Sequence, residues 1–164
     1  MDRHMVAAVD VRPIDPAHPQ ARQCVQAYFA ELGRRFDLGF DPSRSISADA
    51  HELRAAAGLL VLAWLRERPV GCGALKFHGD GPAELKRMWV AESARGMGVG
   101  RRLLADLEDR AAHRGVGTLR LETNRTLNEA ISLYRSAGYV EVPAFNDEPY
   151  AHHWFEKQFV SPHA

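Results

Sequence analysis

The sequence predicts a single α/β domain with one mixed, largely antiparallel β-sheet of about six to seven strands, flanked by about four helices. Three observations lead to this prediction. The chain has 164 residues, the length of one domain. Its composition, 46% hydrophobic and 26% charged, is typical of a globular protein. Strand-like apolar runs are interspersed with helix-like amphipathic segments and no linker separates them, so we expect residues 1–164 to form one unit.

The first half of the chain is expected to contain a strand, two helices and a β-hairpin. Weak alternation predicts a strand over 6–14, and apolar residues at helical spacing after Pro19 predict the first helix. Residues 48–57 have the pattern of a short second helix. Two apolar runs over 59–77, with a turn near Pro69, predict the hairpin, and a further strand is expected over 83–90.

The second half begins with a glycine-rich segment and a strongly amphipathic helix that ends near Gly115. The apolar stripe of this helix consists of Val99, Leu103, Leu104, Leu107 and Ala111. A strand is expected over 118–123. Thr126 and Glu129 have the spacing of a capping box for the next helix, and Gly138 is suited to a left-handed C-cap. Strands over 139–142 and 151–159 complete the predicted sheet.

Charge balance and hydropathy argue against several classes of protein. Lys and Arg number 21, as do Asp and Glu, so the formal net charge is zero, which argues against a nucleic-acid partner bound by bulk charge. No apolar run reaches the roughly 20 residues of a membrane span, and the first residues lack the apolar core of a secretory signal. We therefore expect a cytoplasmic protein without a membrane partner, in which Cys24 and Cys72 are reduced thiols.

The glycine segment, "RGMGVGRR" from Arg95 to Arg102, places three glycines where a helix must begin. No Ser, Thr, Asp or Asn directly precedes the first turn, so its first backbone N–H groups lack capping partners. Uncapped amides and the positive end of the helix dipole attract an anion, and glycines let a phosphate approach the backbone. The structural alternative is a tight strand-to-helix turn without a ligand.

Two nucleotide-binding motifs fail at this segment. A P-loop requires Lys-Ser or Lys-Thr after its last glycine, and neither pair is present. A dinucleotide-binding G-x-G-x-x-G motif fails because Arg101 or Leu103 occupies the third glycine position.

At these residues the sequence resembles the GNAT superfamily of acetyl-coenzyme A-dependent N-acetyltransferases. The R/Q-x-x-G-x-G/A motif of that superfamily corresponds to residues 95–100. The segment "NEAISLYRSAGYVEV", residues 128–142, is similar to its second hallmark, an Asn before a Tyr-bearing helix that is followed by Gly-Tyr. The resemblance implies a sheet that is splayed at a cofactor cleft.

The resemblance also implies that acetyl-coenzyme A is the co-substrate. Its pyrophosphate would lie on the amides from Gly96 to Arg101, and its pantetheine arm would pair with the backbone of Met88 and Val90 like an added strand. Asn128 could bond the pantetheine amides, or help the first helical turn instead. The implied cofactor-binding residues are Met88, Trp89, Val90, Arg95, Gly96, Met97, Gly98, Val99, Gly100, Arg101, Asn128 and Tyr134.

Acetyl transfer to an amine requires a base and an acid. An amine with a pKa near ~10.4 must lose a proton, and the departing thiolate must gain one. Glu84 matches the place of a catalytic Glu in several members of the superfamily, although it could be a solvated acid at a strand end; Glu122 and a bound water are the rival bases. Tyr134 is the predicted acid, with core packing as the alternative.

The predicted acceptor-binding residues are Tyr28, Phe29, Glu122, Tyr150 and His153, with ordinary packing as the alternative for most of them. His152 and His153 point to opposite faces of a strand and do not make a metal site, so no metal is expected. The acceptor is expected to be a primary amine of a small molecule, a protein N-terminus or a lysine. The alternative function is a non-catalytic acyl-coenzyme A binding or sensor module. A homodimer remains open.

Overall fold

The computed structural model describes residues 8–46, 50–54 and 56–159. Its strands are β1 (Asp10–Ile14), β2 (Gly58–Leu65), β3 (Arg68–Lys76), β4 (Ala83–Val90), β5 (Thr118–Thr123), β6 (Val140–Val142) and β7 (His153–Gln158). Its α-helices are α1 (Pro19–Arg35), α2 (Val99–His113) and α3 (Asn128–Ser136). No helix within these described ranges is both long and apolar enough to cross a membrane.

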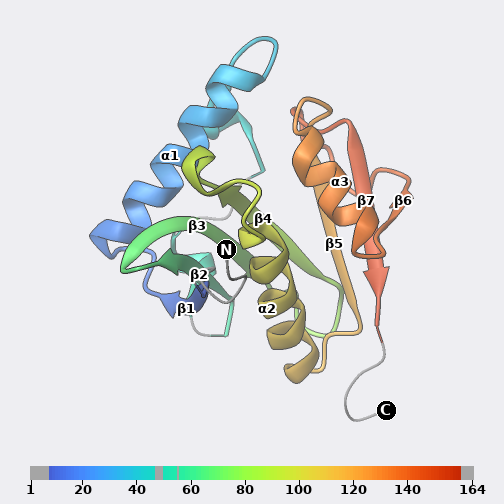
Figure 1. Cartoon of the computed structure of the whole chain (residues 1–164). Coiled ribbons are helices and arrows are strands. Elements are labelled where there is room, and N and C mark those ends of the chain that lie inside the picture. Colours follow the sequence, from blue (N-terminus) through green and yellow to red (C-terminus); the bar gives the residue numbers. More distant parts are fainter. Residues whose placement is uncertain (1–7, 47–49, 55, 160–164) are drawn as a thin grey trace.

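The seven strands form one sheet in the order β1-β2-β3-β4-β5-β7-β6 (Figure 1). Every neighbouring pair is antiparallel except β4 and β5, which run parallel. The prediction of a mixed, largely antiparallel sheet of six to seven strands is therefore confirmed.

Helices cover both faces of the sheet, because the central strands are apolar on both sides. On β2, Leu60 and Leu62 pack in one buried cluster with Ala21 and Cys24 of α1. The alternate β2 residues Val61 and Ala63 belong to the opposite cluster, which holds the apolar stripe predicted for α2. Cys24 and Cys72 are both free thiols and lie together in the α1 cluster.

The prediction of a helix over 48–57 is wrong. Within its described part the chain forms only a 3₁₀ turn, Ala50–Leu53, so three α-helices stand where about four were expected. Leu53 is the buried anchor of this turn. One apolar anchor before Gly58, where β2 begins, does not provide the repeated apolar face that an α-helix buries.

Two local predictions on turns also need correction. The hairpin turn lies at Arg66 and Glu67, whose φ angles are 49° and 69°, and Pro69 belongs to β3. Two central residues with positive φ form the two-residue turn that matches the twist of paired strands. Thr126 does not cap α3, since Leu127 is the N-cap residue and no side chain caps this end.

The C-cap at Gly138 is confirmed. Gly138 has a φ of 97°, and Tyr139 N donates to Tyr134 O at 3.0 Å. Gly138 N donates to Arg135 O at 3.1 Å, which completes a Schellman motif. This cap ends α3 sharply, and the chain turns directly into β6.

Candidate active site

The sheet splits between β4 and β5. The two strands pair only at Ala83 with Leu119 and at Glu84 with Arg120. Arg87 has a φ of 57°, and the register of β3 against β4 shifts beside it, as in a β-bulge. Beyond that point β4 diverges from β5 (Figure 1), and among the described residues its backbone edge has no neighbouring strand on the β5 side.

The glycine segment starts α2 without a side-chain cap, as predicted. Gly98 is the N-cap with a φ of 80°, and the first helical bond runs from Arg102 N to Gly98 O. The amides of the first turn therefore have no intrahelical acceptor. A Cβ added at Gly98 would meet open space, whereas one at Gly100 would lie 3.2 Å from Leu133 Cδ2. Gly98 thus keeps the turn left-handed and open, and Gly100 lets α2 approach α3.

A cavity of about 300 Å³ lies in front of these amides; we call it the glycine-loop cavity. Its floor is the free edge of β4 and the start of α2, and α1 and α3 form its sides. It is lined by Tyr28, Glu31, Leu32, Arg35, Met88, Trp89, Val90, Ala94, Arg95, Gly96, Gly98, Val99, Gly100, Arg101, Leu127, Glu129, Ala130, Leu133 and Tyr134.

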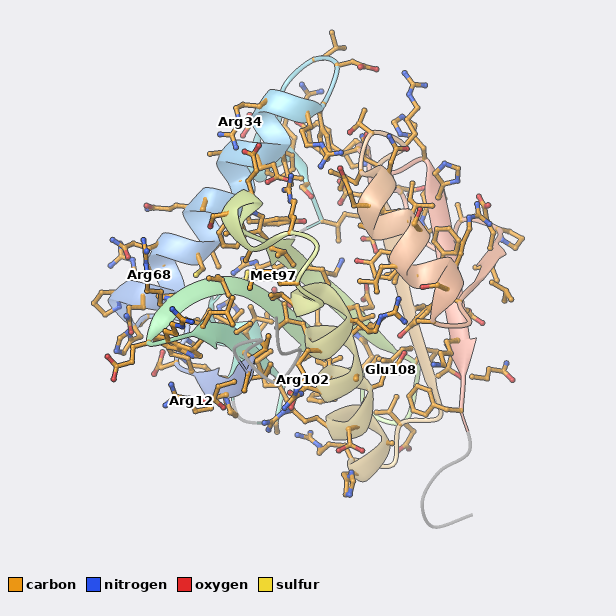
Figure 2. The ribbon with its side chains drawn as sticks, viewed as in Figure 1. Arg12, Arg34, Arg68, Met97, Arg102 and Glu108 are labelled. Atoms are coloured by element: carbon orange, nitrogen blue, oxygen red, sulfur yellow. The ribbon has the colours of Figure 1, made fainter. Side chains whose placement is uncertain are left out.

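The structure places all but two of the predicted cofactor-binding residues on this cavity. Met97 is 43% exposed on the loop before α2 and does not line it (Figure 2). Asn128 is an exposed residue at the first position of α3 and lies outside the lining as well. Arg95 lies at the mouth, where its Nη2 donates to Glu31 Oε1 at 2.5 Å.

A second cavity of about 100 Å³ adjoins the first on the side of β5; we call it the aromatic cavity. Four of the five predicted acceptor-binding residues line it: Tyr28, Phe29, Glu122 and Tyr150. His153 does not, because its Nδ1 is bound to Glu141 Oε2 at 2.7 Å between β7 and β6. The remaining lining residues are Leu32, Phe36, Phe40, Ser45, Ile46, Leu85, Lys86, Arg87, Met88, Leu121, Thr123, Asn124, Leu127, Ala130, Tyr134, Glu148 and Ala151.

The two cavities share part of their walls. The residues common to both linings are Tyr28, Leu32, Met88, Leu127, Ala130 and Tyr134. A molecule in the glycine-loop cavity and another in the aromatic cavity would therefore meet at this boundary.

Tyr134 stands at the boundary from α3. It is 5% exposed, and its ring packs on Tyr139 with centroids 5.8 Å apart. Burial, and secondarily the charge of Glu122, raises the pKa of Tyr134 well above its usual range. The phenol is therefore neutral at physiological pH. Its hydroxyl makes no hydrogen bond to any residue in the described ranges, so it is free to donate to a ligand.

Glu122 reaches the aromatic cavity from β5, with a side chain that is 7% exposed. Its Oε1 accepts from Lys86 Nζ at 2.8 Å and from Asn146 Nδ2 at 3.3 Å. Its Oε2 is buried without a hydrogen-bond partner in the part of the chain that the structure describes. A buried carboxylate oxygen without a donor is costly unless a ligand supplies one.

Glu84 lies next to this group but lines neither cavity. Its Oε1 is 2.5 Å from His78 Nε2, and its Oε2 is 3.2 Å from Lys86 Nζ. Burial tends to raise the pKa of Glu84, but the charges and hydrogen bonds of Lys86 and His78 outweigh burial and lower it. Glu84 is thus an ionised partner of Lys86, with both oxygens engaged.

Sequence reasoning missed two residues that organise the site. Lys86 is buried between Glu84 and Glu122, and the only signal was its i+2 spacing from Glu84, which puts both on one strand face. Asn124 is buried after β5; its Oδ1 accepts from Thr126 N at 3.0 Å, and its Nδ2 donates to Tyr150 O at 2.7 Å. An Asn two residues before a Thr, directly after a strand, is the pattern of an Asx turn.

Polar contacts cross the cleft beside both cavities. Arg35 at the end of α1 donates to Thr126 O at 2.6 Å and pairs with Glu129 at 2.9 Å. The hydroxyl of Tyr150 accepts from Asp41 N at 2.9 Å. These contacts tie the α1 side of the splayed sheet to the β5 side. Within the described residues, no group of His, Cys, Asp and Glu side chains is arranged to hold a metal ion.

The cleft thus combines a splayed mixed sheet, an uncapped helix start and two adjoining cavities. The sequence profile of the acetyltransferase (GNAT) family matches residues 24–139. This chain belongs to the GNAT acetyltransferase family, and the resemblance noted in the sequence is confirmed.

Two relatives and one solved structure show how far the similarity extends. An IAA acetyltransferase of Azospirillum brasilense is 44% identical over 73 residues, which cover 44% of this chain and 48% of that protein, so the chain spans about half of its length. An uncharacterised N-acetyltransferase of Schizosaccharomyces pombe is 33% identical over 136 residues, 80% of this chain and 78% of that protein. A GNAT family acetyltransferase from Elizabethkingia anophelis, solved with acetyl-CoA bound, matches with a TM-score of 0.64 and 17% identity over 92% of this chain and 98% of that one.

Proposed function

We propose that this protein transfers the acetyl group of acetyl-coenzyme A to a primary amine by direct attack of the amine on the thioester. The observation that carries the proposal is the shared wall of the two cavities at Tyr28, Met88 and Tyr134. A donor in the glycine-loop cavity and an acceptor in the aromatic cavity would bring thioester and amine together there, which is the main requirement of a two-substrate transfer.

The donor side is supported by the chemistry of the glycine-loop cavity. The uncapped amides of the first turn of α2 suit a pyrophosphate, and Arg95 and Arg101 add positive charge. The free edge of β4 offers backbone groups from Arg87 to Val90 to the amides of a pantetheine arm. These residues would hold the donor, and the bound donor would supply the reactive thioester.

Glu122 is the base that the geometry favours. Glu122 lines the aromatic cavity, and its buried Oε2 has no partner among the described residues, whereas both oxygens of Glu84 are occupied by His78 and Lys86. The ammonium first gives one proton through Glu122 to solvent, which leaves a neutral amine. As the nitrogen of this amine forms its bond to the carbonyl carbon, its N–H becomes acidic, and Glu122 takes that second proton. We therefore assign the base to Glu122, the rival of Glu84 in the sequence, and assign Glu84 the role of holding Lys86 in place.

Tyr134 is the donor for the leaving group. When the carbon–sulfur bond breaks, the sulfur takes the electron pair, and the phenol hydroxyl can give it a hydrogen bond. The raised pKa of Tyr134 keeps this hydroxyl protonated, so its main contribution is a hydrogen bond to the sulfur as negative charge builds up there. Full transfer of its proton to a thiolate is uphill, because a thiol is the stronger acid, and solvent must complete the protonation. The products are an amide and a free thiol.

A thiol-release assay over a panel of amines tests the proposal. We expect acetyl-coenzyme A to yield free thiol only when an amine is present, with the N-acetyl product detected by mass spectrometry. Calorimetric titration with acetyl-coenzyme A provides a separate measure of donor binding. Donor binding without thiol release for any amine would contradict the proposal and identify the chain as an acyl-coenzyme A binding module.

A further inference from the structure

The aromatic cavity has a continuous wall of rings. Phe40 lies at the centre of this wall, with its ring centroid 5.5 Å from that of Phe29, 5.7 Å from that of Phe36 and 4.9 Å from that of Tyr150. Tyr28 extends the wall to the boundary with the glycine-loop cavity, 5.6 Å from Phe29. Such a surface favours an apolar or aromatic group.

The cavity lining also carries a buried carboxylate oxygen with unmet hydrogen-bonding capacity, Glu122 Oε2. Glu148 accepts from Ser45 Oγ at 2.9 Å and from Ile46 N at 2.6 Å, so it is occupied in holding its own loop. Lys86 is held by Glu84 and Glu122. That leaves Glu122 Oε2 as the buried carboxylate oxygen without a donor among the described residues.

The other cationic side chain in the lining, Arg87, contacts one of the rings. The Arg87 guanidinium lies over the ring of Phe29 at 5.6 Å, in cation–π contact. The lining thus presents one carboxylate oxygen in need of a donor and a row of rings.

The volume of the cavity limits what can enter. It measures about 100 Å³, and an apolar cavity of roughly 150 Å³ holds one benzene molecule. The aromatic cavity alone is smaller than that, but it shares a wall with the glycine-loop cavity, so a single ring or a short alkyl chain is the largest group that can lie on the rings with its amine near Glu122 and Tyr134.

On the basis of the proposed transfer, we infer that the acceptor is a small monoamine with a single apolar group, either one ring or an alkyl chain of about five carbons. Its ammonium donates to Glu122 Oε2, and its apolar group packs on Phe40, Phe29 and Tyr150. In a diamine, the second ammonium, at the opposite end of the molecule, would lie among the rings. It would then be far from Glu122 Oε2, the described carboxylate oxygen that lacks a partner. Its desolvation would cost more than a cation–π contact returns.

Two matched amines test this inference without any mutation. Pentylamine and 1,4-diaminobutane have the same length and differ by a terminal methyl in place of a second amine. We expect kcat/KM for pentylamine and for 2-phenylethylamine to exceed that for 1,4-diaminobutane by about tenfold or more. Equal or higher kcat/KM for the diamine would overturn the inference while leaving the transfer intact. Absence of turnover with every amine would instead contradict the proposed function.

Variants of the wall provide a second test. Phe40→Ala and the milder Phe40→Leu should lower kcat/KM for 2-phenylethylamine by about tenfold or more and leave that for methylamine, which does not reach the wall, nearly unchanged. Phe145→Leu is the control, since Phe145 lies over Arg120 and outside both cavities. Equal losses for both amines, or no loss for 2-phenylethylamine in either Phe40 variant, would contradict the inference.

Discussion

Lys86 Nζ lies 2.8 Å from Glu122 Oε1, and this contact joins β4 to β5 at the point where the two strands separate. Both side chains are more than 90% buried. The pair holds one oxygen of the Glu122 carboxylate, and the second oxygen is buried without a partner among the described residues. Glu84, on the other side of Lys86, completes a row of alternating charges across the base of the cleft.

Removing the central cation should destabilise the fold. Lys86→Met leaves two buried carboxylates without their counter-charge, and loss of one partner from a buried pair costs about 3–5 kcal/mol. Urea denaturation measures this free energy of unfolding. Arg125→Ala breaks the exposed pair with Asp37 and should cost less than about 1 kcal/mol. Equal costs for the two variants would contradict a structural role for Lys86.

The contribution of Glu84, Lys86 and Glu122 to the free energy of unfolding should depend on pH in a defined direction. The pKa of Glu84 is lowered, so its stabilisation is present above the ordinary glutamate value of about 4.3 and is lost as pH falls through the lowered pKa. Burial tends to lower the pKa of Lys86, but the charges of Glu122 and Glu84 outweigh burial and raise it. The contribution of Lys86 to stability is therefore present below the usual lysine pKa and is lost as pH rises through the raised pKa. The difference in unfolding free energy between the parent and Lys86→Met should therefore be widest from about pH 5 to pH 10 and narrow on both sides. A difference that does not vary with pH would contradict this linkage.

Glu122→Gln should reduce kcat by about 10²–10⁴-fold, the usual effect of losing a general base. Glu84→Gln should reduce kcat by much less, because Glu84 does not line the cavity, and its main effect should be on stability. Steady-state kinetics over a pH range, together with urea denaturation, separates the two effects. A larger kcat loss for Glu84→Gln than for Glu122→Gln would return the role of base to Glu84.

Tyr134→Phe keeps the ring and its packing on Tyr139 and removes only the hydroxyl. We expect little change in stability and a fall in kcat of about tenfold or more, toward the roughly 10²–10⁴-fold effect of losing a positioned acid. An acetyl donor whose leaving group needs no proton should recover much of the rate. Tyr28→Phe is the control, since Tyr28 stands at the same boundary. Full activity of Tyr134→Phe would leave protonation of the sulfur to water.

Gly98→Ala should weaken acetyl-coenzyme A binding by about tenfold or more, because its methyl group would enter the open space where a phosphate is expected. Alanine in a left-handed conformation also costs about 1–2 kcal/mol of stability. Gly115→Ala is a matched control: Gly115 has a φ of 83° and open space around it, at the opposite end of α2. Calorimetric titration should show loss of affinity only at Gly98, and an equal loss at Gly115 would contradict the phosphate site.

Elements with a clear local pattern could be predicted from the sequence. The strand over 83–90, the apolar stripe of α2 and the C-cap at Gly138 depend on residues close together in the chain, and all three are confirmed. The cap of the third helix was predicted wrongly, because Thr126 is bound to Asn124 instead. Local competition between two short polar side chains decided this turn.

The choice between Glu84 and Glu122 could not be made from the sequence. Each is a glutamate on a predicted strand, and the sequence does not give the register between those strands. The pairing of Glu84 with Arg120 sets this register and brings Glu122 beside Lys86. The packing of α2 against the β5 side of the sheet likewise depends on residues far apart in the chain, since Glu108 accepts from Tyr139 and Lys157.

The central claim, that donor and acceptor meet at the wall shared by the two cavities, is tested most directly by a crystal structure of the protein with coenzyme A and 2-phenylethylamine. The account predicts the pyrophosphate on the amides that begin α2 and the sulfur next to the Tyr134 hydroxyl. It also predicts the amine nitrogen within hydrogen-bonding distance of Glu122 Oε2. An amine bound outside the aromatic cavity, or a sulfur directed away from Tyr134, would contradict it.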